Sequence, residues 1–98
     1  MDEQQERREA EAYKIDGDLT ICRVAELRER LLTFVVTVNE VEVDLRGVTD
    51  CDAAGLQLLV SLKRTAEEAG KQFLLTNLPS SLVELIRGLG LEAACPVE

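Results

Sequence analysis

The stretch of sequence that decides the fold runs from Val43 to Leu56 and reads Val-Asp-Leu-Arg-Gly-Val-Thr-Asp-Cys-Asp-Ala-Ala-Gly-Leu. Its beginning continues an alternation of apolar and acidic residues that starts at Val41, and such alternation is typical of a strand with one buried face. Asp52 stands where a helix N-cap belongs, because its carboxylate can accept hydrogen bonds from the unpaired amides of a first helical turn. The stretch therefore predicts a strand, a loop and a helix that begins at Ala53.

The predicted helix over residues 53–69 has one apolar face. The core face spans about 100° of arc and comprises Gly55, Leu58, Leu59, Leu62, Ala66 and Ala69. Gly70 follows where a left-handed C-terminal cap belongs. Leu56 and Val60 fall outside this arc, so we expect a neighbouring loop to cover them or a partner to contact them.

The segment before this helix predicts a hairpin and a second helix. Asp16-Gly17-Asp18 separates two alternating runs, residues 12–15 and 19–22, and an Asp-Gly pair in that position is a hairpin signal. Apolar residues then recur at helical spacing over residues 23–35.

The segment after it predicts one more strand and one more helix. The apolar run in residues 72–76 is nearly continuous, which predicts a strand buried on both faces. Ser81 and Glu84 have the spacing of a capping box, so we expect them to open a helix that ends near Gly88.

This order of elements predicts an α/β fold with an approximately four-stranded mixed sheet and helices mainly on one face. The parallel strands form its centre and the hairpin adds an antiparallel edge. We expect residues 1–11 to be a charged tail and residues 12–98 to be the domain. The expected core includes Leu27, Leu31, Leu45, Leu59, Leu62, Phe73 and Leu75.

Composition narrows the classes of function. The chain has 98 residues, 46% of them apolar and only 3% aromatic, with a net charge of -8. A nucleic-acid ligand would require a basic surface instead. No apolar run approaches the roughly 20 residues that span a bilayer, and the charged N-terminus does not resemble a signal peptide. We therefore expect a cytoplasmic protein without direct membrane insertion.

The side chains available for chemistry are few. The sequence has no histidine, and its three cysteines, Cys22, Cys51 and Cys95, form no C-x-x-C pair. We interpret the cysteines as reduced thiols packed as small apolar residues. No nucleophile has a visible activating partner and no glycine-rich phosphate loop is present, so we expect neither an enzyme, nor a metal site, nor a cofactor.

An ordered set of segments resembles the STAS domain, the family shared by anti-sigma factor antagonists and the cytoplasmic ends of sulfate transporters. The matching segments are Asp16–Leu19, Val43–Leu56, Lys71–Asn77 and Leu85–Leu91. The resemblance covers residues 12–91. In regulated members of this family, a Ser or Thr follows the Asp that opens the helix. A partner serine kinase, itself an anti-sigma factor, phosphorylates that hydroxyl.

This sequence departs from the family at the phosphorylated position. Ala53 and Ala54 follow Asp52, and neither can carry a phosphate. Thr49 is the nearest hydroxyl. The resemblance therefore implies a STAS module that is not phosphorylated at the usual site.

The resemblance implies a non-catalytic signalling adaptor or regulator that binds a protein partner. That partner would be an anti-sigma kinase or a related component, such as a chemotaxis-type signalling protein, and a homodimer remains open. Two alternatives are a STAS subunit of a membrane transporter complex and a nucleotide-binding module. The candidate partner-binding residues are Asp50, Asp52, Ala53, Ala54, Gly55, Leu56, Gln57 and Val60.

Overall fold

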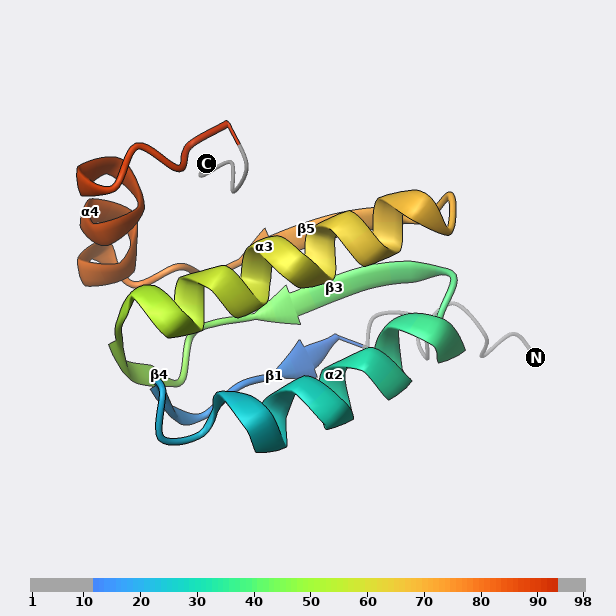
Figure 1. Cartoon of the computed structure of the whole chain (residues 1–98), viewed down its shortest axis with the longest axis horizontal. Helices are drawn as coiled ribbons and strands as arrows, with labels where there is room; N and C mark the ends of the chain where they lie inside the picture. Colours follow the sequence, from blue (N-terminus) through green and yellow to red (C-terminus); the bar gives the residue numbers. More distant parts are fainter. Residues whose placement is uncertain (1–11, 94–98) are drawn as a thin grey trace.

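A computed structural model of the chain describes residues 12–93 (Figure 1). Its elements in chain order are β1 (Tyr13–Lys14), β2 (Gly17–Leu19), α2 (Val24–Thr37), β3 (Glu40–Asp44), β4 (Val48–Cys51), α3 (Ala53–Glu68), β5 (Gln72–Thr76) and α4 (Ser80–Gly88). The prediction for residues 1–11 lies outside the described residues, as does that for Cys95. The α/β class predicted from the sequence is confirmed.

All paired strands of the described residues are parallel. Three strands form a sheet in the order β1-β3-β5, and β2 pairs with β4 beside it. Two backbone bonds link these pairings, because the Ile15 amide donates to the Asp44 carbonyl and the Gly17 amide donates to the Gly47 carbonyl, at 3.1 and 2.9 Å. The chain thus runs from β1 to β2 without reversing, alongside β3 and β4.

The antiparallel hairpin predicted at Asp16-Gly17-Asp18 is therefore wrong. Gly17 has a φ of +84°, which glycine tolerates without strain, but it bends the strand instead of turning it back. The two short strands on either side of this bend do not pair with each other: β1 pairs with β3, and β2 pairs with β4. The Arg23 guanidinium holds the bend, since its Nη1 donates to the carbonyls of Asp16 and Asp18 at 2.7 and 2.9 Å.

Helices α2 and α3 lie side by side on one face of the sheet, and α4 lies beyond the carboxyl ends of the strands (Figure 1). The predicted end of α3 is confirmed: Gly70 has a φ of +76°, and the Lys71 amide donates to the Ala66 carbonyl at 2.9 Å, as in a Schellman cap. The predicted capping box of α4 is wrong. Its cap is Pro79, without a side-chain bond, and Ser81 already lies inside the helix.

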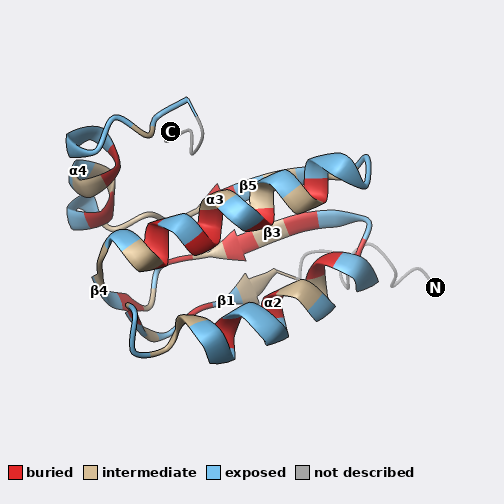
Figure 2. Cartoon of the chain, viewed as in Figure 1, coloured by how far each residue is buried: buried red, intermediate tan, exposed pale blue. Residues whose placement is uncertain are grey.

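The core lies between the sheet and the helices (Figure 2). Of the residues in the expected core, Phe73 is only half-buried, and Ala69, expected on the core face of α3, is exposed. Strand β5 was expected to be buried on both faces, yet Leu74 is 45% exposed while Leu75 is 5% exposed. Alternate residues of a strand point to opposite faces, and the two long helices cover only one of them.

Candidate functional site

Asp52 connects the end of the β2 strand to the start of α3. One carboxylate oxygen, Oδ1, accepts from the Gly55 amide at 3.0 Å, and the other, Oδ2, accepts from the Ile21 amide at 3.1 Å. Its own amide donates to the Leu19 carbonyl at 3.3 Å. The predicted N-cap is confirmed, and the same carboxylate also fixes the turn that follows β2.

These contacts change the acidity of Asp52. The hydrogen bond from the Ile21 amide, followed by that from Gly55, lowers the pKa of the Asp52 carboxyl below its usual value. Hydrogen bonds to the charged form favour that form. The negative charge of Asp52 is therefore stabilised by the backbone amides of Ile21 and Gly55.

Because Gly55 has no side chain, the backbone of α3 can pack directly against the backbone of β2 at Leu19. A Cβ at this position would lie 1.9 Å from the Leu19 carbonyl oxygen and 2.8 Å from the Leu19 carbonyl carbon. Gly55 is buried, so it has a packing role and presents no surface to a partner.

The structure places only part of the predicted surface in solvent. Asp50, Ala53 and Gln57 are exposed, Asp52, Ala54 and Val60 are half-buried, and Gly55 and Leu56 are buried.

The expectation that Leu56 lies outside the core is wrong, because the residue is 0% exposed. α3 packs against α2 as well as against the sheet. The buried face of α3 is therefore wider than the face that contact with the sheet alone would bury.

The three aspartates near the strand ends have separate structural partners. The Asp44 carboxylate accepts from the Arg46 amide at 2.9 Å and from the Asn77 side chain at 3.1 Å. These bonds, the one from Arg46 first, lower the pKa of Asp44. Within residues 12–93, no group of three or more His, Cys, Asp and Glu side chains is placed to hold a metal ion.

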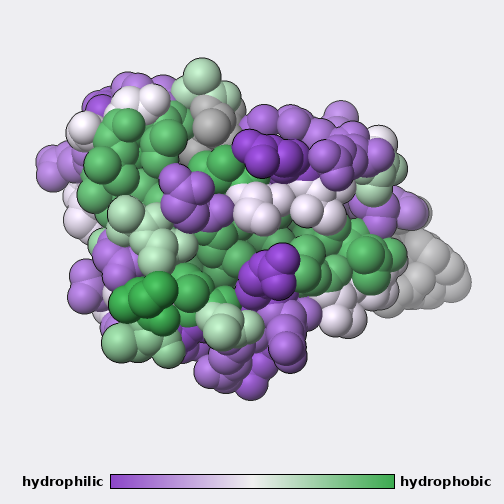
Figure 3. All heavy atoms as spheres, in the orientation of Figure 1, coloured by the Kyte–Doolittle hydropathy of each residue, from purple (hydrophilic) through white to green (hydrophobic). Residues whose placement is uncertain are grey.

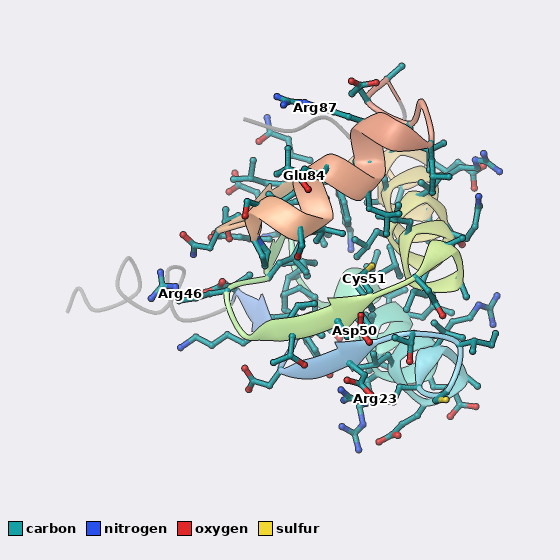
Figure 4. All side chains as sticks on the ribbon, turned by 90° about the vertical axis from the view of Figure 1, so that its left-hand side faces the viewer. Arg23, Arg46, Asp50, Cys51, Glu84 and Arg87 are labelled. Atoms are coloured by element: carbon teal, nitrogen blue, oxygen red, sulfur yellow. The ribbon has the colours of Figure 1, made fainter. Side chains whose placement is uncertain are left out.

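Asp50 lies on β4, beside β2, at the end of the molecule that faces the viewer in Figure 4. It accepts from the amide of Cys51 at 2.9 Å and is opposite Asp18 in the β2–β4 register. Both side chains are exposed. Two carboxylates are therefore neighbours on this end of the molecule, which also carries Arg23, Arg46 and Arg87 (Figure 4).

The turn at residues 20–23, which we call the β2–α2 turn, is not predicted from the sequence. Ile21 and Cys22 had been assigned to a strand, but β2 ends at Leu19 and Ile21 is 66% exposed. Cys22 is also exposed, contrary to the expectation that it packs as a small apolar residue, whereas Cys51 is half-buried with its Sγ 3.5 Å from the Asp52 carbonyl. The contact between Ile21 and Asp52 joins residues 31 positions apart, so no local sequence signal reveals it.

Comparison with known proteins identifies the family of this chain. The family model described as "Mlab, STAS domain" matches residues 3–96. The chain belongs to the STAS domain family, as its sequence segments indicated.

A solved structure with the same fold is that of a sulfate transporter family protein from Wolinella succinogenes. The TM-score is 0.68 at 21% sequence identity, over 85% of this chain and 68% of that one. This likeness establishes the fold. No helix in the described part of the chain has the length and apolar character needed to cross a membrane.

Proposed function

We propose that this STAS domain is a non-catalytic cytoplasmic adaptor or regulator that binds another protein at the start of α3. The observation that carries the proposal is the geometry of this start. Ala53 and Gln57 are exposed there, while Asp52 already satisfies the Gly55 amide at 3.0 Å. The exposed side chains of Ala53 and Gln57 carry no charge, so they give this helix start an uncharged contact surface next to Asp52.

The same geometry bears on regulation. In regulated STAS proteins a phosphate follows the helix-opening aspartate and adds about two negative charges. Ala53 occupies that position here and cannot be modified in this way. We therefore propose a partner contact that is not switched by phosphorylation at residue 53, with an anti-sigma kinase or a related signalling component as the partner.

A second candidate is a STAS subunit of a membrane transporter complex. The family description names Mlab, and the similar solved structure comes from a sulfate transporter family protein. Both candidates require a protein contact, and they differ in the partner.

Purification of the tagged full-length chain from its native cell distinguishes them. A co-purifying kinase-like ATPase domain supports the first candidate, and a transporter ATPase subunit supports the second. A chain that instead binds or turns over a nucleotide on its own supports the nucleotide-binding alternative and contradicts both.

Titration with the purified partner then tests the location of the contact. Ala53→Arg places a long charged side chain at the proposed centre and should weaken binding by about 1–3 kcal/mol, because that side chain must be desolvated. Gln72→Arg is the matched control, since it adds the same charge at an exposed position on β5. Equal weakening by both variants, or by neither, would contradict this location.

A further inference from the structure

Ile21 is an exposed apolar side chain at the end of the molecule where α2 and α3 begin. It is 66% exposed, and hydrophobic atoms gather at this end of the molecule (Figure 3). Cys22 and Ala53, which follow Ile21 and Asp52 respectively, are exposed as well. Ile21 therefore adds an apolar contact to the surface already formed by the start of α3.

The backbone that carries Ile21 is held from two sides. The Ile21 amide donates to Asp52 Oδ2 at 3.1 Å. The Thr20 carbonyl accepts from the amides of Arg23 and Val24 at 2.8 and 3.0 Å. A side chain on a preorganised turn loses little further conformational entropy when it is buried by a partner.

The charges around Ile21 restrict the partner. Asp18 and Asp50 are exposed neighbours in the β2–β4 register. Arg23 is the cation of this turn, and it keeps its positive charge because its Nη1 donates to the neutral carbonyls of Asp16 and Asp18. The carboxylates of Asp18 and Asp50, together with Asp52, outnumber it around Ile21. The whole chain carries a net charge of -8. A basic partner is attracted to such a surface, whereas an acidic partner is repelled.

We propose that Ile21 is the apolar anchor of the partner contact, and that the partner offers an apolar pocket rimmed by arginine or lysine side chains. Asp18 and Asp50 are the acidic rim on this side. The inference rests on the proposed function, which places a protein contact at the start of α3.

Two synthetic amphipathic peptides serve as probes of this chemistry. They share the same leucine and phenylalanine positions, and their remaining positions are arginine in one and glutamate in the other. Each is titrated into the full-length chain and followed by amide chemical shifts. The basic peptide should perturb the amides of residues 20–23 and 53–57, with affinity falling as salt increases, and the acidic peptide should not bind.

Variants separate an anchored contact from general attraction to an acidic protein. Ile21→Ser should weaken binding of the basic peptide by at least about tenfold, as expected for a central anchor. Val36→Ser is the matched control, because Val36 is 69% exposed on the far end of α2, and it should leave the affinity unchanged. Asp50→Asn should weaken binding and reduce its salt dependence.

Three results would overturn the inference: no binding of the basic peptide, equal effects of the Ile21 and Val36 variants, or equal affinity for both peptides. None of these would remove the proposed function. That function falls only if the native partner fails to bind, or if it binds independently of Ala53.

Discussion

Replacement of Gly55 by alanine tests the close approach of α3 to β2. Helix propensity alone favours alanine over glycine by about 1 kcal/mol inside a helix. The structure predicts the opposite result. The added Cβ would lie 1.9 Å from the Leu19 carbonyl oxygen, about 1.5 Å closer than the 3.4 Å at which ordinary contact begins.

Neither side of this contact can move freely. The obstructing atoms include the backbone of Leu19, whose strand pairs with β4. The start of α3 is held by the bond between Asp52 and the Gly55 amide, 3.0 Å long. Overpacking of this kind costs about 1–3 kcal/mol and occasionally more, and a helix displacement would also strain the cap.

The expected net effect is a loss of about 1–3 kcal/mol in the free energy of unfolding, because so deep an overlap belongs at the upper end of the overpacking range and outweighs the gain in propensity. For a domain of this size the melting temperature should fall by about 4–24 °C. Thermal and urea unfolding followed by circular dichroism measure both quantities.

Gly88→Ala is the matched control. Gly88 is the last residue of α4, and a Cβ there has nothing within 4 Å. The same substitution should therefore be neutral or stabilise the domain by about 0.5 kcal/mol. A Gly55→Ala variant that melts at or above the wild-type temperature would refute the reasoning, since helix propensity would then outweigh the contact with Leu19.

Three further predictions follow from named contacts. Leu56→Ala should cost about 2–5 kcal/mol of stability because Leu56 is 0% exposed, and an unchanged urea midpoint would show that the residue is not in the core. The pKa values of Asp44 and Asp52 are lowered in the folded state, so the contribution of these carboxylates to stability is complete above the unfolded-state pKa of 3.8 and is lost as the pH falls through their folded-state pKa values. Acid unfolding should therefore show a component below pH 3.8 that Asp52→Asn reduces. An acid unfolding profile of Asp52→Asn identical to that of wild type would contradict this prediction. Lys71→Met should cost about 1 kcal/mol by removing the 2.6 Å bond from Lys71 Nζ to the Val35 carbonyl, with faster exchange of amides in the last turn of α2 as the readout and unchanged exchange there as the contrary result.

The parts of the fold that local sequence predicts correctly are those set by neighbours along the chain. Asp52 caps α3 and Gly70 ends it because both positions satisfy backbone groups a few residues away. Helix α2 extends to Thr37 despite its β-branched end, since Val35 is buried and Lys71 binds its carbonyl at 2.6 Å. Here a tertiary contact outweighs a local preference.

The errors have a common cause in packing between distant segments. The residues around Gly17 carry a hairpin signal, but their hydrogen bonds come from β3 and β4, some 30 positions further along the chain. Leu56 lies outside the helical arc that would be buried if α3 packed against the sheet alone. In the structure α3 packs against both α2 and the sheet, so Leu56 is buried as well. The exposure of Ile21 was not predicted either, because the turn that exposes this residue depends on the carboxylate of Asp52, 31 positions further along the chain.

Asp52 therefore links the fold to the proposed contact. A regulated STAS domain must change its surface where a phosphate is added, next to the helix-opening aspartate. In this chain both oxygens of that aspartate hold backbone amides, of Ile21 and of Gly55, and the adjacent residue is Ala53. The exposed turn and the helix start are thus fixed relative to each other by a single carboxylate that stays charged at neutral pH. Because Ala53 cannot be phosphorylated, under the proposed function the occupancy of this surface depends on the amount and the charge of the partner.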